Sequence, residues 1–298
     1  MRIVTRPDFD GVVCAVLIAD ALDIEPPVYW VEPNELSKGT ADIRPGDILA
    51  NLPYHPRCDT WFDHHSTNRI DRAFKGRFRE SPSAARLVFE YYQGRFKRDF
   101  GELTYWADRI DSADFSQDEV LHPEKYAYVL LSMTVSGEAG RDEAYWERLV
   151  RMLREKDIAQ VAAHPEVEAR CRNVIRQNSE YAGWLRKFTR TEGRVAVTDF
   201  RSLAQPPSGN RFLTYSLFPE AVVSVRIRYE DPGRRTVVVN IGHSIFNPGC
   251  NVHVGRLLAA FGGGGHRGAA SARFPADKAD IYLPQIISTL VQNLPDLN

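Results

Sequence analysis

Four short apolar segments near the N-terminus most constrain what this 298-residue chain can fold into. They are residues 3–5, 28–31, 48–52 and 60–63, and each is bounded by Pro, Gly or Asp. A longer apolar segment with helical spacing, residues 11–22, follows the first of them. Short strands that are apolar throughout are typical of a mostly parallel sheet flanked by helices. We therefore predict an α/β fold for the N-terminal part.

Polar side chains follow these predicted strands at their carboxyl ends. Asp8 and Asp10 follow the first strand, Asn51 lies at the end of the third, and His64 and His65 come after the fourth. The carboxyl ends of parallel strands share one edge, where open α/β sheets bind ligands. Imidazole and carboxylate groups together suit Mn2+, Fe2+ or Zn2+. Helix capping is the alternative role for the two aspartates, and we favour the metal site because two adjacent histidines follow.

The rest of the chain predicts a helical stretch and then a second, smaller domain. Apolar residues at three- and four-residue spacing predict helices over 83–92, 101–110, 143–153 and 157–188. Two strand-like segments, 222–228 and 236–240, then flank a Glu-Asp-Pro-Gly turn, which is a hairpin signal. A predicted helix over 252–261 follows them. We predict a metal-binding domain over 1–155, a helical connector over 156–190 and a mixed-sheet α/β domain over 191–298, with the site in the cleft between the two domains.

Four glycines, Gly262 to Gly265, precede His266 near the C-terminus. Glycine backbone lacks Cβ atoms and can point its N–H groups at anionic oxygens at close range, while a histidine adds a further donor. A flexible loop is the alternative interpretation. We favour a phosphate cradle because the run follows a predicted helix.

Composition excludes several classes of protein. A formal net charge of −1 argues against a protein that coats nucleic acid electrostatically. The four cysteines contain no Cys-x-x-Cys pair for zinc or redox chemistry. The longest apolar run is far short of a bilayer span, and no signal-peptide pattern is present. We expect a cytoplasmic protein without a membrane partner.

Four motifs together resemble those of the DHH/DHHA1 phosphoesterase family. They are residues 5–11, the Asp-His-His at 63–65, Ile-Asp-Ser-Ala-Asp at 110–114, and the glycine run with His266. That family includes oligoribonucleotide and phosphoadenosine-phosphate phosphatases, RecJ-like exonucleases, cyclic-dinucleotide phosphodiesterases and exopolyphosphatase-related proteins. The resemblance covers nearly the whole chain. It implies a metal-dependent hydrolase that acts on phosphoester bonds.

The resemblance also implies roles for individual residues. Metal ligands are expected at Asp8, Asp10, Asn51, His64 and Asp111. Catalytic roles fall to His65, which stabilises charge, and to Asp8, which directs a water. Asp63 is expected to orient a histidine rather than to bind metal. Substrate contacts are expected from the second domain, at Arg226, His243, Asn251, Gly263, Gly264, Gly265 and His266.

Two positions depart from the family pattern. Val4 stands where most members have a histidine that binds a second metal, and Asn51 stands where a bridging aspartate is usual. A neutral amide oxygen does not offset the repulsion between two dications. We therefore expect one divalent metal per site, Mn2+ or another. His55 is a conceivable replacement ligand, and Asp108 and Asp114 are doubtful ones.

The first functional hypothesis is a phosphoesterase that removes a terminal phosphate or nucleotide from a small phosphorylated substrate or short oligonucleotide. One alternative is an exopolyphosphatase-like hydrolase of phosphoanhydride bonds. Another is a phosphate- or nucleotide-binding protein with degraded catalysis, which the changes at Val4 and Asn51 would explain. The choice among substrates stays open, and a homodimer is compatible with the resemblance.

Overall fold

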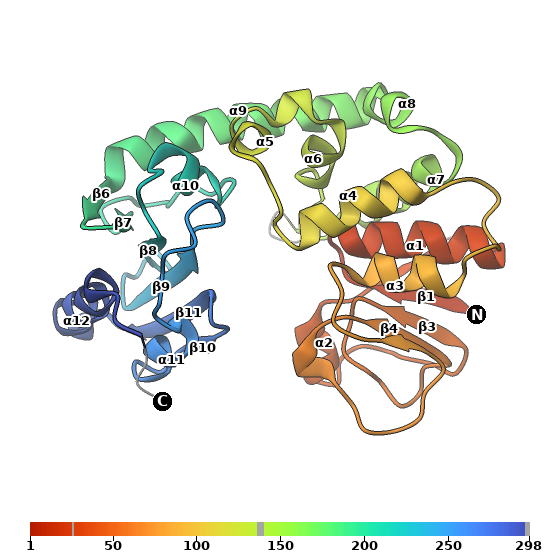
Figure 1. Cartoon of the computed structure of the whole chain (residues 1–298), viewed down its shortest axis with the longest axis horizontal. Coiled ribbons are helices and arrows are strands. Elements are labelled where there is room, and N and C mark those ends of the chain that lie inside the picture. Colours follow the sequence, from red (N-terminus) through yellow and green to blue (C-terminus); the bar gives the residue numbers. More distant parts are fainter. Residues whose placement is uncertain (26, 136–139, 296–298) are drawn as a thin grey trace. The chain divides into compact units, whose positions relative to one another are not determined.

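The computed structural model describes residues 1–25, 27–135 and 140–295. The chain forms two compact units, whose helices and strands are labelled in Figure 1. The first comprises Met1–Phe115 and Pro123–Val174, and the second comprises Ser116–His122 and Ile175–Asn298. Each unit has its own sheet, so the predicted α/β architecture is confirmed. None of the described helices has the length and apolar character that a membrane span requires.

The first unit is built on a wholly parallel sheet in the strand order β2-β1-β3-β4-β5. The four predicted strands are confirmed, and a fifth, β5, was not predicted because it is only three residues long. From β1 the chain moves to one side to form β2 and then returns to the other side to form β3. This order makes the carboxyl ends of β1 and β3 the switch point of the sheet, where ligands of such folds bind. The strands are β1 (Arg2–Thr5), β2 (Tyr29–Trp30), β3 (Asp47–Ala50), β4 (Thr60–Asp63) and β5 (Gly76–Phe78).

Helices α1 and α3 contact the sheet strands on one face, and α1 is also packed against α4 and α7 (Figure 1). The apolar sequence of α1 explains this position, because nearly all of its residues are buried. The helices of this unit are α1 (Phe9–Leu22), α2 (Pro33–Ser37), α3 (Ala84–Tyr91), α4 (Gly101–Asp111), α6 (Ala127–Ser132), α7 (Glu143–Glu155) and α8 (Ile158–Ala162), with short 3-10 turns η1 (Ser66–Asn68) and η2 (Pro123–Lys125). Helix α9 (Pro165–Phe188) runs from the first unit into the second.

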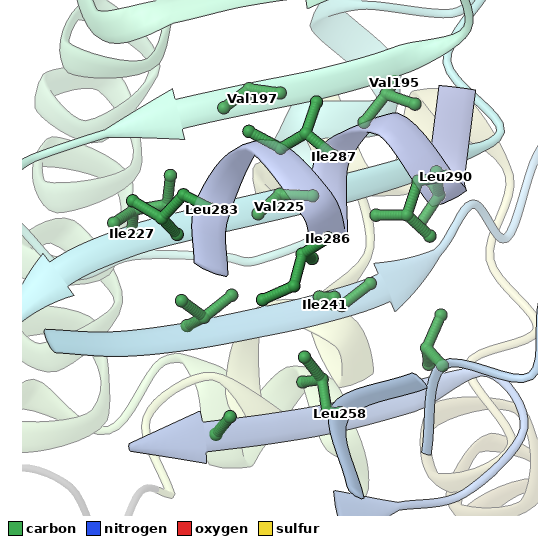
Figure 2. Packing of buried hydrophobic residues seen from close by; sticks show 14 of the residues in the cluster. Val195, Val197, Val225, Ile227, Ile241, Leu258, Leu283, Ile286, Ile287 and Leu290 are labelled. Carbon is green, nitrogen blue, oxygen red and sulfur yellow. The ribbon is translucent and has the colours of Figure 1, made fainter. Parts of the chain in front are cut away.

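The second unit contains a six-stranded mixed sheet in the order β10-β11-β9-β8-β7-β6. The predicted hairpin is confirmed, since β8 and β9 pair antiparallel across the Glu-Asp-Pro-Gly turn. Helix α12 lies along one face of the sheet and buries Leu283, Ile286 and Ile287 against its strands (Figure 2). Its elements are β6 (Thr189–Glu192), β7 (Val195–Asp199), β8 (Val223–Tyr229), β9 (Thr236–His243), β10 (Gly264–Gly265), β11 (Ala269–Pro275), α5 (Gln117–Leu121), α10 (Leu213–Leu217), α11 (Val254–Ala259), η4 (Ala276–Lys278) and α12 (Ala279–Gln292).

Candidate metal centre

Asp8 ends the turn between β1 and α1 and caps that helix. Its Oδ1 accepts hydrogen bonds from the Gly11 backbone N–H at 2.8 Å and from Nδ2 of Asn51 at 3.0 Å. The capping role considered for Asp8 is therefore present. Its Oδ2 lies 3.1 Å from Nε of Arg6, so the carboxylate is held on both sides.

Asp10 is buried and is fixed by the N-terminus of α3. Its two oxygens accept the backbone N–H groups of Ala84 and Ala85 at 2.9 and 2.8 Å. These N–H groups have no partner within their own helix, so a carboxylate there is favourable. The contact fixes the orientation of Asp10 and leaves its remaining lone pairs for another ligand.

Asn51 follows β3 in the left-handed region, with φ of 57°. Asparagine tolerates this conformation better than most residues. Its Nδ2 donates to Asp8, while its Oδ1 is buried and has no hydrogen-bond partner among the described residues. Reversing the amide would place its oxygen against the Asp8 carboxylate, so the unpaired atom is the oxygen. A buried acceptor without a donor is normally paired with a cation or an ordered water.

Asp63, at the end of β4, is fully buried and organises the two histidines after it. It accepts the His64 backbone N–H at 2.9 Å, Nδ1 of His65 at 2.8 Å and Nδ2 of Asn68 at 2.7 Å. The role expected for Asp63, orienting a histidine, matches these contacts. The hydrogen bond from His65 to Asp63 raises the pKa of His65 above its usual value.

The two ring nitrogens of His64 have different surroundings: Nδ1 contacts the backbone, and Nε2 faces an acidic residue. Its Nδ1 lies 2.9 Å from the Ser81 carbonyl oxygen, which only accepts, so Nδ1 carries the hydrogen. Its Nε2 is buried, has no hydrogen-bond partner among the described residues, and lies 3.3 Å from Oδ2 of Asp111. The contact of Ser81 with His64 could not be predicted from the residue type, because Ser81 makes it through its backbone carbonyl.

Three of the predicted ligands converge on one point. Asp10, His64 and Asp111 each offer one ligand atom, and these atoms lie within 4.8 Å of one another. Asp111 is the last residue of α4, so three separate elements contribute. Asp63, His64 and His65 are also close together. We favour the first group because the Asp63 carboxylate is already occupied by the donors described above.

The acidic residues of this centre lack sufficient compensating charge. Burial raises the pKa of Asp10 well above its usual value, and Asp111 and Asp8 raise it further by repulsion. Burial, and then repulsion by Asp8, raises the pKa of Asp111 to about 6. A divalent cation relieves this repulsion. Together with Nε2 of His64 and Oδ1 of Asn51, which have no hydrogen-bond partner among the described residues, the donor set fits a divalent metal ion.

The doubtful candidates have other partners. Asp108 accepts Nε and Nη2 of Arg86 and the Ser83 hydroxyl, which ties α4 to α3. Asp114 is exposed and pairs with Arg109. His55 accepts the Arg57 backbone N–H through Nδ1, in a turn after β3.

Val4 belongs to the apolar core and offers no ligand. It is fully buried in a cluster with Leu49 and Trp61, its neighbours across β3 and β4. Val31, Ile43 and Leu52 belong to the same buried cluster. Most family members have a histidine ligand of the second metal at this position. In this chain it is occupied by an apolar side chain.

In the second unit, Arg226 lies in a polar row that crosses the sheet. Register places it between Thr198 of β7 and Asn240 of β9, with Ser271 of β11 next and Gly264 of β10 at the end. Strand alternation puts this row on the face opposite α12. Asn240 and Ser271 were missed, although alternation in the 236–243 strand indicates that Asn240 shares a face with Arg226.

Two predicted substrate residues are engaged elsewhere. His243 has Nε2 3.0 Å from the Val252 carbonyl, and burial lowers its pKa. Strand alternation also places it on the other face from Arg226. Asn251 donates its side-chain and backbone N–H groups to Asn293, after α12. The structure therefore does not bring these two residues into the row of Arg226.

The glycine run forms a tight hairpin beside α11. The N–H groups of Gly262 and Gly263 donate to carbonyls of α11, and that of His266 donates to Ala269. A Cβ on Gly263 or Gly265 would lie 2.4 Å from a backbone oxygen of β11, that of Ser271 or Ala269 respectively. Within the run, Gly264 alone combines open space around its Cα with a φ outside the positive range. His266 is exposed next to it.

Comparison with solved structures identifies proteins that share this fold. The chain matches the pGpG-specific phosphodiesterase PggH of Vibrio cholerae with TM-score 0.85 and 27% identity, over 98% of this chain and 99% of that one. It matches RecJ of Thermus thermophilus in complex with Mn2+ with TM-score 0.57 and 13% identity, over 99% of this chain and 52% of that one. The DHH domain of a member of a ribosomal-protein family matches with TM-score 0.50 and 12% identity, over 98% of this chain and 87% of that one.

At 12 and 13% identity, the last two matches show the fold alone. No protein-family model matches the chain, and comparison with curated protein sequences gives no match. The PggH match covers both units, and the Asp-His-His sequence is placed at the carboxyl edge of the parallel sheet. The motifs, the two sheets and this likeness support the resemblance of the chain to the DHH/DHHA1 phosphoesterase family.

Proposed function

We propose that the chain is a metal-dependent phosphodiesterase that hydrolyses a short phosphorylated substrate such as a linear dinucleotide. The observation that carries this proposal is the convergence of Asp10, His64 and Asp111, beside a buried amide oxygen of Asn51 without a partner among the described residues. The likeness to a phosphodiesterase described as pGpG-specific supports the choice of a dinucleotide. An exonuclease structure of the same fold with manganese supports Mn2+ as the ion.

One ion per site accounts best for the donor set. Asp10, His64 and Asp111 would hold it, and Asn51 would contribute its oxygen. A second dication would need an anionic bridging ligand and a further donor near β1. Asn51 is neutral, and Val4 is enclosed in the apolar core.

A bound divalent ion supplies Lewis acidity and makes a coordinated water acidic enough to ionise near neutral pH. Asp8 lies at the mouth of this centre and would orient the attacking water through its partly exposed carboxylate. His65 is held by Asp63 through Nδ1, so its Nε2 is the nitrogen available to a phosphate oxygen. In the second unit, the part of the Gly263 to His266 run around the exposed Gly264, together with the His266 and Arg226 side chains, would bind phosphate, since glycine backbone and guanidinium groups suit that anion.

Two other functions compete with this one. A phosphate- or nucleotide-binding protein without turnover is favoured by the neutral Asn51 and by the buried Val4. An exopolyphosphatase-like activity uses the same metal and phosphate groups on a phosphoanhydride bond. Both predict binding of phosphorylated ligands, so products must be measured.

The test is a substrate panel with added Mn2+ or Mg2+, followed by chromatographic product analysis. The panel contains pGpG, another linear dinucleotide, short oligoribonucleotides, phosphoadenosine phosphate and polyphosphate. We expect the wild type to convert the dinucleotides to mononucleotides with Mn2+, and His64→Ala to do so about a thousandfold more slowly. Binding without product would favour the binding protein, and phosphate release from polyphosphate alone would favour the exopolyphosphatase.

A further inference from the structure

Arg6 places a permanent cation beside the candidate metal centre, and the family motifs give it no role. It lies in the turn between β1 and α1, and its side chain is 39% exposed. Its Nε is 3.1 Å from Oδ2 of Asp8 and 4.0 Å from Oε2 of Glu32. Neither Nη atom forms a hydrogen bond with any residue in the described ranges. A guanidinium with two unused N–H₂ groups can still bind an anion.

Several other arginines of the first unit give their donors to carboxylates. Arg86 gives Nε and Nη2 to Asp108, at 2.8 and 2.5 Å. Arg77 and Arg79 share the carboxylate of Glu90. These contacts fix the guanidinium groups to the protein. Arg6 differs from them because, among the described residues, its one close carboxylate contact leaves the end of the fork free.

The electrostatics of the centre give such a cation a purpose. A phosphate anion must approach a group of carboxylates, and uncompensated like charge opposes its binding. Burial raises the pKa values of Asp8 and Asp111, and the Arg6 charge opposes this rise, so its field reaches both carboxylates. Unlike a histidine, arginine carries its charge at every physiological pH.

We propose that Arg6 binds a nonbridging oxygen of the phosphoryl group under attack, exchanging its contact with Asp8 for one with the substrate. The proposal rests on the proposed function and assigns this residue a place in the same site. The planar guanidinium suits bidentate binding of phosphate. Its partial exposure leaves the free N–H₂ groups accessible to a ligand.

The variants Arg6→Gln and Arg6→Lys test this role, with Arg44→Gln as the matched control. Arg44 is also exposed and paired with a nearby aspartate, Asp42, but it lies just before β3, at the amino-terminal edge of the same sheet. Turnover of pGpG and calorimetric binding of inorganic phosphate to the Mn2+-loaded protein are measured for each protein. Manganese content is determined in parallel.

We expect Arg6→Gln to lower kcat/KM by about a hundredfold, as loss of a single charge-stabilising donor does. Phosphate affinity should fall with it, Arg6→Lys should restore part of both, and manganese content should not change. Arg44→Gln should behave as the wild type. Equal phosphate affinity and turnover in Arg6→Gln and the wild type would overturn the proposal.

Failure of the proposed function has a different signature. A wild type that turns over no member of the panel would refute the phosphodiesterase. Phosphate binding would still decide the role of Arg6, because that measurement needs no turnover. Loss of manganese from Arg6→Gln would instead show that Arg6 positions Asp8 for the metal, which would also overturn the proposal.

Discussion

The metal centre of the first unit and the predicted phosphate-binding residues of the second unit differ in how far the structure defines them. At the metal centre, backbone groups fix Asp10 and His64 so that each presents its remaining atoms to the same point. In the second unit, His266 is exposed and His243 and Asn251 have other partners. The buried Asp10 carboxylate, which Asp111 and Asp8 repel, favours a bound cation, whereas an exposed glycine hairpin tolerates either the presence or the absence of a ligand.

This difference assigns separable roles to the two units. Substitutions at the metal centre should change metal content and activity together. Substitutions in the glycine run should change phosphate affinity and leave metal content as it is.

The largest effect is expected for His64→Ala. Removing one of three strong ligands should abolish manganese retention. Turnover should fall by about a thousandfold, because the metal no longer stabilises the charge that develops on the phosphate. Elemental analysis after desalting checks the metal, and His55→Ala is the control because His55 lies in a turn away from the converging ligands. Unchanged retention in His64→Ala would show that the ligand set is wrong.

A smaller effect is expected for His266→Ala. Loss of one charge-assisted phosphate contact should raise the dissociation constant for phosphate about ten- to a hundredfold, which corresponds to roughly 1.5–3 kcal/mol. Calorimetry measures the affinity, and manganese content should stay at the wild-type level. Loss of the metal, or wild-type affinity for every phosphate compound tested, would contradict separate roles.

The smallest and most selective change is Gly264→Ala. The structure leaves open space at this position, so a methyl group fits the fold but would hold a phosphate away from the backbone. We expect about tenfold weaker phosphate binding at an unchanged melting temperature. Gly183→Ala, in the exposed part of α9 with equally open space, is the control and should bind phosphate normally. Normal binding by Gly264→Ala would support a purely structural hairpin.

Much of the fold and of the metal centre could be predicted from the sequence. The apolar runs identified β1, β3 and β4, and the polar residues after them reach one edge because parallel strands end together. Asp111 depended on resemblance, because a helical series of aspartates is equally typical of a solvated face. The structure separates these aspartates by their contacts, since Arg86 binds Asp108 while Asp111 faces His64.

Other features left no sequence signal. The carbonyl of Ser81 fixes the tautomer of His64, and a backbone contact of that kind can follow any residue type. Strand β5 is too short and polar for a periodic pattern. In the glycine run, the need for Gly263 and Gly265 comes from close packing against β11, which a sequence cannot distinguish from a ligand requirement.

The central claim is that one divalent ion is held by Asp10, His64 and Asp111 of the first unit. The most direct measurement is the manganese content of wild-type protein that has been saturated with Mn2+ and then desalted. The account predicts one equivalent per chain, because Val4 and Asn51 offer no ligand set for a second ion. Two retained equivalents, or none, would contradict it.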